Sequence, residues 1–400
     1  MSTTAAADPF GSAKELHEVL ARLRRESPVT EMPLPNGATA WLVTRYEDAQ
    51  RALGDPRLSK AVSASGVNYR NLVPPEVGEA VTRHMLATDP PDHTRLRRLV
   101  SSAFTARRTA ALRPWIEELA ERLLDEMAGA EQVDLLDAYA YPLPIQVLCQ
   151  LLGVPVEEQA DFRGWVSAIV AGPMDVRAWP PAITAMVGYI GELLERKRRQ
   201  PGDDLLSALL AVRDEGDRLT DDELTSMVYL LLIAGHETTA NLIANGMLVL
   251  LAEPDRWARV VAAPELLPGV IEELLRYEGP VQAASFRTTL EPVELGGQLI
   301  PAGASVLVSL ASANRDPARY AEADQLVLNR PAVPNLAFGH GIHYCLGAPL
   351  ARLEAQVAFR ALARRFPGIR LAIPVDEVVW RPSLLIRCLT GLPVTLNGTR

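Results

Sequence analysis

Residues 338–347 read Phe-Gly-His-Gly-Ile-His-Tyr-Cys-Leu-Gly, and a sequence with helical periodicity follows them from Ala348-Pro349 onward. Proline suits the first turn of a helix, so we expect a helix to begin directly after this segment. Cys345 therefore lies just before a helix N-terminus, where free N–H groups and the helix dipole stabilise a thiolate over a thiol. The three glycines of the segment let the backbone wrap closely around a sulfur and a flat partner.

A cysteine in this position has the design of a soft axial ligand to haem iron, where thiolate donation favours cleavage of the O–O bond. For a lone cysteine, an inert buried side chain is the alternative and the more frequent case. The two further cysteines, Cys149 and Cys388, are too few and too scattered for a disulfide framework or a Cys-x-x-Cys zinc site. The spacing of the residues around Cys345 favours the haem ligand.

A long helix is predicted over residues 221–252. Thr220 and Glu223 form a capping box at its start, and Pro254 stops it. Apolar residues occur nearly all round this helix, so we expect it to be buried on most sides.

The middle of the long helix contradicts such an environment. Residues 234–239 read Ala-Gly-His-Glu-Thr-Thr, which places a glycine, an acid and two hydroxyls inside an apolar helix. One interpretation is a kink that packs against another helix. The other, which we favour, is a groove where small Gly235 admits a ligand while Glu237 and Thr238 handle protons.

The composition excludes several classes of protein. The chain has 400 residues, of which 48% are hydrophobic and 22% are charged, and this can bury a large core. A net charge of −9 and only 6% aromatic residues disfavour nucleic-acid binding. Apolar runs reach only about eight or nine residues, and the first twenty residues hold no signal-peptide stretch. We therefore expect a cytoplasmic protein without membrane insertion.

Helical periodicity predominates, and strand patterns are few and short. This predicts an α+β fold, mainly α, that forms a single domain over residues 1–400 with flexible residues 1–11. Two stretches without clean periodicity, 61–85 and 172–181, are predicted loops that either form the mouth of a pocket or simply connect elements. The predicted helices are 12–25, 92–104, 111–127, 181–199, 221–252, 266–277 and 348–366; the predicted strands are 40–44, 293–300, 305–309 and part of 384–396, with a turn over 296–303.

Five residues of the cysteine segment have the spacing of a family signature, Phe-x-x-Gly-x-His-x-Cys-x-Gly. They are Phe338, Gly341, His343, Cys345 and Gly347, and through them the sequence resembles the soluble bacterial cytochromes P-450. Residues 234–239 are similar to the oxygen-activation motif of this family, and Glu273 and Arg276 to its Glu-x-x-Arg pair. The resemblance extends from about residue 33 to residue 394.

The resemblance implies a P-450-type helical domain with small separate β-sheets and a haem b buried between the long central helix and the cysteine loop. Cys345 is then the iron ligand, Thr238 the alcohol that assists dioxygen activation, and Glu237 the acid that relays protons. Glu273, Arg276 and Arg330 resemble a structural ion network behind the cysteine loop. The other residues expected at the cofactor are His93, Arg97, Arg287, His343, Ala234, Gly235, Phe338, Gly339 and Gly347.

His93 and Arg97 lie four residues apart, on one face of a predicted helix, which is the spacing needed to grip a single anion. The resemblance makes them contacts of a haem propionate together with Arg287 and His343, because arginine can bind a carboxylate with two hydrogen bonds. A solvated helix face is the alternative for this pair.

The implied activity is insertion of one oxygen atom of O2 into a C–H bond of a hydrophobic, mid-sized to large molecule, by hydroxylation or epoxidation. Family members of this type act in secondary metabolism on polyketides and macrolides, or on steroids and terpenoids. Two alternatives are a peroxide-driven oxygenase or decarboxylase and a non-catalytic haem-binding sensor; the pair Glu237 and Thr238 argues against both. The expected pocket walls include Leu86, Ile233, Ala283, Ala284, Leu385 and Ile386.

Electrons derived from NAD(P)H have to come from a partner, because the chain holds no Rossmann fingerprint, flavin module or Fe–S cysteine set. We expect a ferredoxin with its ferredoxin reductase as the donor, and a monomeric enzyme. A basic patch near the cysteine could bind such an acidic donor, although solvated helix faces explain its arginines equally well. The patch would comprise Arg95, Arg98, Arg107, Arg108, Arg113, Arg352, Arg360, Arg364 and Arg365.

Overall fold

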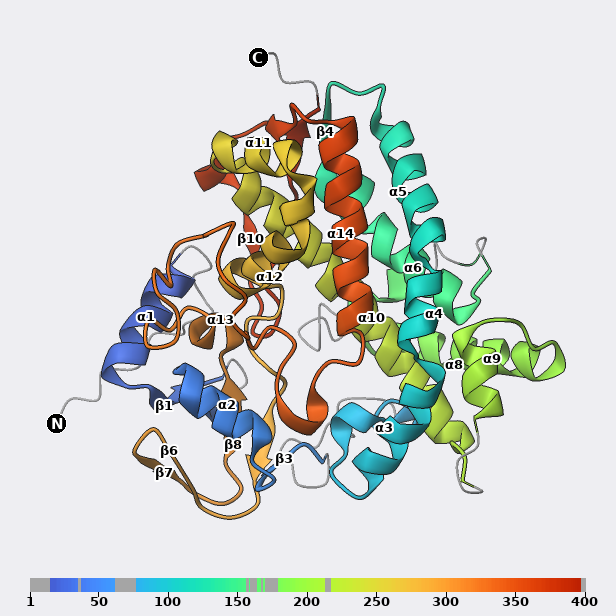
Figure 1. Ribbon diagram of the computed structural model, residues 1–400. Helices are drawn as coiled ribbons and strands as arrows, with labels where there is room; N and C mark the ends of the chain where they lie inside the picture. The colour runs from blue at the N-terminus through green and yellow to red at the C-terminus, as the bar shows by residue number, and fades with distance from the viewer. Residues whose placement is uncertain are drawn as a thin grey trace. The chain divides into compact units, whose positions relative to one another are not determined.

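The chain divides into two compact units in a computed structural model (Figure 1). The first unit comprises residues 1–59, 115–142 and 238–400, and the second comprises residues 60–114 and 143–237. The division falls inside the helix α10 (Asp221–Leu251), between Glu237 and Thr238. The structure describes residues 15–34, 37–61, 77–155, 158, 164–166, 168–169, 179–212 and 217–396, so residues 1–11 and much of both predicted loops lie outside it.

The first unit contains a five-stranded mixed sheet with the order β1-β2-β8-β5-β3. Strands β2 and β8 pair in parallel, and the other neighbours are antiparallel. Buried aliphatic side chains such as Val43 and Val308 form a core against α2 (Tyr46–Gly54). The strands are β1 (Val29–Pro33), β2 (Thr39–Val43), β3 (Leu58–Ser59), β5 (Arg287–Thr289) and β8 (Ser305–Val308).

Three small sheets complete the β-structure that the described residues form. They are β4 (Gln132–Asp134) with β12 (Pro393–Thr395) and β9 (Arg370–Leu371), the hairpin of β6 (Val293–Leu295) and β7 (Gln298–Ile300), and the pair of β10 (Trp380–Arg381) and β11 (Cys388–Leu389). The turn predicted over 296–303 is partly wrong, because residues 298–300 form a strand. The hairpin turns at Gly296 and Gly297 alone, which have φ angles of 55° and 78° that only glycine adopts at low cost.

Phe359 on α14 (Ala348–Arg365) is fully buried and lies close to α10 in the first unit. A Cβ on Gly246 of α10 would lie 2.7 Å from Cζ of Phe359 and 3.0 Å from a methyl group of Leu274, so glycine permits the close approach of these helices. Figure 1 shows α14 between α5 and α12. The remaining helices are α1 (Leu16–Glu26), α5 (Arg113–Met127, which starts in the second unit), α11 (Pro254–Ala262), α12 (Leu267–Glu278) and α13 (Leu310–Ala313), with one π-helical turn (Leu136–Ala140) and short 3-10 turns Pro264–Leu266, Gly341–His343 (η8) and Val375–Glu377.

The described residues of the second unit form helices and loops and none of the named strands. The capping box predicted for α10 is confirmed: the Glu223 N–H donates to the Thr220 hydroxyl (3.3 Å), and the Thr220 N–H donates to the Glu223 carboxylate (2.9 Å). Arg95 of α3 donates to Glu223 and to Asp217, which ties α3 to the start of α10. The elements are the 3-10 turn η4 (Met85–Ala87), α3 (Asp92–Ala103), α4 (Ala106–Ala111), α6 (Pro142–Leu152), α8 (Trp179–Arg199), α9 (Leu205–Ala211) and the first half of α10.

The prediction of a mainly α fold with small separate sheets is confirmed, and six predicted helices differ from the observed ones by no more than about three residues at either end. Among the described residues, α10 is the one helix whose length and composition would also suit a membrane span. Of the 18-residue stretch of α10 that meets this criterion, 61% is buried inside the protein, as is common for a core helix.

Glu354 of α14 generates a first prediction. Its side chain is 2% exposed, its Oε2 has no hydrogen-bond partner, and burial raises the pKa of this carboxyl well above its usual value. The native state therefore keeps a proton that the unfolded chain releases above about pH 4.5, so stability falls as the pH rises. We expect Glu354→Gln to gain stability relative to the wild type by up to about 1.4 kcal/mol per pH unit above that pH.

Urea unfolding of both proteins between pH 4 and pH 8 measures this difference. Glu118→Gln on α5 provides the control, because it makes the same substitution at an exposed position. A difference between Glu354→Gln and the wild type that stays constant with pH would contradict the assignment of a neutral Glu354.

Candidate active site

The cysteine segment folds into successive tight turns that end at α14. The N–H of Gly339 donates to the carbonyl of Leu336 (2.8 Å), and the N–H of Tyr344 donates to the carbonyl of Gly341 (3.1 Å). A third bond runs from the N–H of Cys345 to the carbonyl of Phe338 (2.9 Å) and closes the loop.

Cys345 is exposed and stands two residues before Gly347, the N-cap of α14. The helix begins at Ala348 with Pro349 in its first turn, as the sequence predicts. A Cβ on Gly347 would lie 3.8 Å from Sγ of Cys345, so any side chain at this position would stand against the sulfur. An accessible sulfur beside the free N–H groups of an 18-residue helix is a donor suited to a soft metal.

Gly341 holds this loop against the end of α2. Its φ angle is 72°, and a Cβ there would lie 3.0 Å from the carbonyl oxygen of Leu53 and 3.3 Å from Cα of Gly54. The signature glycine at this position therefore satisfies two constraints, a left-handed backbone and a close contact between two chain segments.

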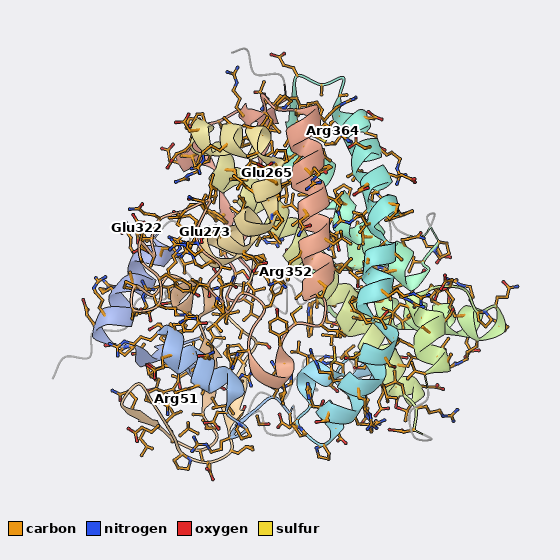
Figure 2. The ribbon with its side chains drawn as sticks, in the orientation of Figure 1. Arg51, Glu265, Glu273, Glu322, Arg352 and Arg364 are labelled. Carbon is orange, nitrogen blue, oxygen red and sulfur yellow. The ribbon has the colours of Figure 1, made fainter. Side chains whose placement is uncertain are left out.

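Arg352 and Glu272 support the loop from its other side, and the sequence did not reveal this role. The guanidinium of Arg352 lies 4.4 Å from the centre of the Phe338 ring and donates to both carboxylate oxygens of Glu272 on α12. Figure 2 shows Arg352 and Arg364 toward opposite ends of α14. Arg352, which the sequence suggested for a basic docking patch, is thus paired with a carboxylate, as are Arg364 (with Glu121) and Arg365 (with Asp125).

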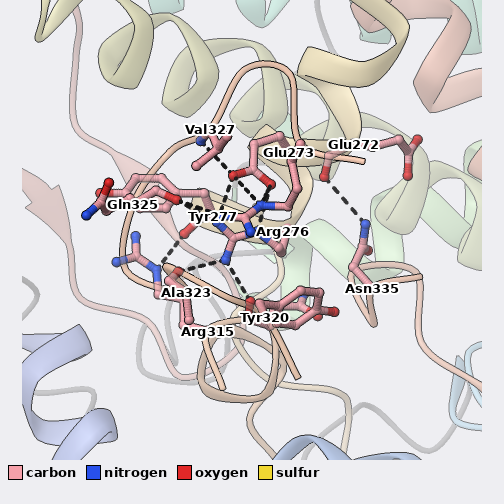
Figure 3. Close-up of polar contacts among 12 residues, drawn as sticks. Glu272, Glu273, Arg276, Tyr277, Arg315, Tyr320, Ala323, Gln325, Val327 and Asn335 are labelled. Atoms are coloured by element: carbon pink, nitrogen blue, oxygen red, sulfur yellow. Dashed lines mark hydrogen bonds and ion pairs between the residues drawn. The ribbon is translucent and has the colours of Figure 1, made fainter. Parts of the chain in front are cut away.

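The structure brings Glu273, Arg276 and Arg330 together in one network. Figure 3 shows Glu273 beside Arg276, and both side chains are buried. Arg276 donates to both carboxylate oxygens of Glu273 at 2.7 and 2.8 Å, and Nε of Arg330 donates to the same carboxylate at 3.0 Å. The remaining donors of the two arginines bind carbonyl groups of the chain before the cysteine loop. These acceptors are Asn314, Ala321, Glu322, Ala323 and Gln325.

The network keeps Glu273 ionised. Burial raises the pKa of Glu273, but the hydrogen bonds from Arg276, the Val327 N–H and Arg330 outweigh this effect and hold the pKa below its usual value. The carboxylate therefore stabilises the fold above its unfolded pKa, and this contribution is lost as the pH falls through the lower pKa of the folded state.

On α10, the residues predicted for oxygen chemistry lie where part of the helix surface is accessible. Ala234 is exposed, Ile233, Gly235 and Thr238 are half-buried, and Glu237 is 3% exposed. Accessible positions 231, 234, 235 and 238 follow the i, i+3, i+4, i+7 pattern of one helix face. They form an accessible stripe along one face of the helix.

Gly235 of α10 lies next to α6. A Cβ at this position would lie 3.4 Å from a methyl group of Leu148 on α6. This is an ordinary van der Waals distance, and the predicted place of Gly235 at the cofactor stays a prediction.

The predicted propionate contacts come from both units. His93 and Arg97 belong to α3 in the second unit, and burial together with the Arg97 charge lowers the pKa of His93. Arg287 is a buried residue of β5 that donates to the carbonyl of Leu58 (3.3 Å), and His343 ends the turn η8; both are in the first unit. Their convergence on one group stays a prediction.

The structure joins two of the predicted pocket segments. The N–H of Gln282 donates to the carbonyl of Leu385 (2.9 Å), and Val281 pairs with Ile386 across an antiparallel bridge. Ala283 is buried, Ala284, Leu385 and Ile386 are half-buried, and Leu86 lies half-buried in η4 of the second unit.

An accessible cysteine just before a helix N-terminus in a mainly α chain is an arrangement that suits a haem-thiolate protein. A family profile described as Cytochrome P450 matches residues 177–368. The vitamin D(3) 25-hydroxylase of Pseudonocardia autotrophica is 47% identical, with 95% of this chain and 94% of that protein covered. The 6-deoxyerythronolide B hydroxylase of Saccharopolyspora erythraea is 44% identical, with 96% of each covered. The P450 monooxygenase TamI, solved with tirandamycin C bound, is 48% identical, with 95% of this chain and 97% of that chain covered and a TM-score of 0.88.

This chain therefore belongs to the cytochrome P450 family. It is a haem-dependent monooxygenase that uses O2, a small hydrophobic substrate and electrons from a redox partner. The residues present fit the haem, because Cys345 offers an accessible sulfur and Gly347 keeps the space beside that sulfur clear of side chains.

Gly341→Ala generates a second prediction. Gly297 has a similar φ angle of 78°, but a Cβ there would meet nothing within 4 Å, so Gly297→Ala reports the cost of the left-handed backbone alone. We expect that cost to be about 1 kcal/mol, and Gly341→Ala to cost about 1–3 kcal/mol more because its Cβ meets the backbone of α2. Urea unfolding of the haem-loaded variants measures both, and equal costs would contradict the role of close packing.

Proposed function

We propose that Cys345 binds the iron of haem b and that Glu237 and Thr238 deliver protons for insertion of one oxygen atom into a C–H bond. The observation that carries this proposal is the accessible Cys345 sulfur two residues before the N-cap of α14, with a glycine at a position whose Cβ would contact the sulfur. The helix N-terminus stabilises the thiolate form that an iron ligand requires.

The haem supplies dioxygen activation when it is bound, and the chain supplies its surroundings. In the proposed site, Phe338, Gly339 and Gly347 of the cysteine loop and Ala234 and Gly235 of α10 would contact the cofactor. His93, Arg97, Arg287 and His343 bind the propionates. Arginines suit this task because a guanidinium matches a carboxylate with two parallel hydrogen bonds.

Glu237 and Thr238 are neighbours on α10, with different exposure. The half-buried Thr238 hydroxyl can donate one hydrogen bond and accept another on the accessible stripe, so it can hold a proton at the reacting oxygen. The buried Glu237 carboxylate beside it can take up a proton from water and pass it on.

The substrate that we propose is a hydrophobic molecule of the size of a polyketide, macrolide, steroid or terpenoid. The half-buried side chains of Ala284, Leu385 and Ile386 support an apolar pocket, with Leu86, Ile233 and Ala283 as further walls. The named substrates of two relatives, vitamin D3 and 6-deoxyerythronolide B, support this size and polarity. Hydroxylation is the proposed reaction, with epoxidation where the substrate presents a double bond.

We further propose a monomeric, cytoplasmic, single-domain enzyme that receives NAD(P)H-derived electrons through a ferredoxin and its reductase. Pairing of Arg352, Arg364 and Arg365 with carboxylates lowers the net positive charge that these residues offer to an acidic donor. Rates of reduction by a ferredoxin that fall with rising salt would support charge-guided docking, and rates independent of salt would count against it.

Thr238→Ala generates a third prediction. Loss of this hydroxyl should leave haem content and substrate binding unchanged, while the fraction of NADPH that yields product falls by about tenfold or more and hydrogen peroxide appears instead. Thr239→Ala is the matched control, because Thr239 is buried and lies off the accessible stripe. Measured ratios of product, peroxide and NADPH decide the matter, and tight coupling in Thr238→Ala would refute its role.

One assay separates the proposed monooxygenase from the two alternatives. The purified enzyme is supplied with NADPH, ferredoxin and reductase, and separately with hydrogen peroxide alone, each with a panel of hydrophobic compounds that includes vitamin D3 and 6-deoxyerythronolide B. Product formed with NADPH and O2 supports the proposal, and a substrate-induced change in the haem absorption spectrum identifies compounds that enter the pocket. Product with peroxide alone indicates the peroxide-driven enzyme, and binding without turnover indicates a sensor.

A further inference from the structure

Three cationic or basic side chains converge on the carboxylate of Glu278, the last residue of α12. Nε of Arg387 donates to Oε1 at 2.8 Å, a terminal nitrogen of Arg315 donates to Oε2 at 3.1 Å, and Nε2 of His17 lies 3.0 Å from Oε2. The Glu278 side chain is 8% exposed and both arginine side chains are 7% exposed. All four residues belong to the first unit, and none has a role in the proposed oxygen chemistry.

Glu278 contributes one negative charge to the cluster, and the two arginines contribute two positive charges. Burial raises the pKa of Glu278, but His17, Arg387 and Arg315 together hold it well below its usual value. Burial lowers the pKa of His17, and the neighbouring Glu278 opposes this effect. The arginines are needed because a carboxylate at the C-terminal end of a helix faces the negative end of the helix dipole.

Arg387 links this cluster to the two pocket segments by its side chain and its backbone. Its N–H donates to the carbonyl of Pro280 (2.8 Å), and its own carbonyl accepts from the side-chain amide of Asn245 (2.8 Å). Its guanidinium lies 3.5 Å from the centre of the Trp380 ring, which fixes its direction. Residues 384–387 are thereby fastened to residues 280–283, next to the bond from Gln282 to Leu385.

The other two partners of Glu278, His17 and Arg315, belong to parts of the chain that hold no proposed pocket residues. His17 extends from α1, and Arg315, which follows α13, also donates to the carbonyl of Tyr277 at 2.8 Å (Figure 3). His17 and Arg315 therefore hold the end of α12, whereas Arg387 alone connects Glu278 to the proposed pocket segments.

We propose that Glu278 and Arg387 are positioning residues that set the register of Leu385 and Ile386 against Ala283 and Ala284, and so select the position at which the substrate is oxidised. The inference rests on the proposed function, which assigns both segments to the pocket. Because a displacement of about 1 Å is enough to alter the alignment of reacting atoms, a small slip between the segments should change the ratio of oxidised isomers.

The test compares the haem-loaded variants Arg387→Gln, Arg387→Lys and Glu278→Gln with His17→Gln. His17→Gln is the matched control, because it alters one contact of the same carboxylate without touching the pocket segments. We measure hydrogen exchange at the amide of Gln282 and the dissociation constant of 4-phenylimidazole, whose nitrogen binds haem iron and whose ring enters the pocket. For any panel compound that the wild type oxidises, the isomer ratio is measured as well.

In Arg387→Gln and Glu278→Gln, we expect exchange at Gln282 to rise by about tenfold and the dissociation constant to change by about threefold or more. His17→Gln should keep both wild-type values even if its melting temperature falls. Arg387→Lys should restore both values in part, because lysine keeps a cation beside Glu278. The proposal would be overturned if both Arg387 variants kept the wild-type exchange at Gln282 and the wild-type dissociation constant. This result decides the matter even if Glu278→Gln fails to fold. Absence of turnover in the wild type would count against the proposed function alone, since exchange at Gln282 needs no turnover.

Discussion

The ionised, buried carboxylate of Glu273 is the constraint on which the rest of the site depends. It accepts hydrogen bonds from Arg276, Arg330 and the Val327 N–H, and the spare donors of the two arginines bind five carbonyl groups of the chain that leads to the cysteine loop. A chain without regular secondary structure thus acquires a fixed path, because removal of any member would leave a buried charge without its partner. This chain continues directly into the cysteine loop in front of α14.

Two glutamates on α12, five residues apart, each pair with two arginines but hold different segments of the chain in place. Glu273 shares its charge between two arginines and fixes the approach to the cysteine loop, whereas Glu278 shares its charge between Arg315 and Arg387 at the end of the helix. A single carboxylate that serves two guanidinium groups leaves a net positive cluster, and carbonyl groups and aromatic rings complete the coordination of both. The helix α12 is therefore an anchor for two loops of the proposed site.

Capping residues and prolines in the sequence predicted the ends of the helices at which they occur. The capping box at Thr220, the proline stop at Pro254 and Pro349 gave the bounds of α10 and the start of α14 within a residue or two, because these signals act on adjacent backbone groups. Apolar helices without periodicity, such as α6, and strands of two or three residues carry no comparable signal. The family signature identified Cys345, but the partners Glu272 for Arg352 and Glu278 for Arg387 lie 80 and 109 residues away and arise only through tertiary packing.

The central claim is that the Cys345 sulfur is the ligand of haem iron. The absorption spectrum of the dithionite-reduced carbon monoxide complex tests it most directly, with Cys345→Ser as the comparison and circular dichroism as the check that both proteins are folded. The account predicts a thiolate-type spectrum for the wild type that is lost in Cys345→Ser. A histidine-type spectrum from folded wild-type protein, or an unchanged thiolate-type spectrum in the variant, would contradict it.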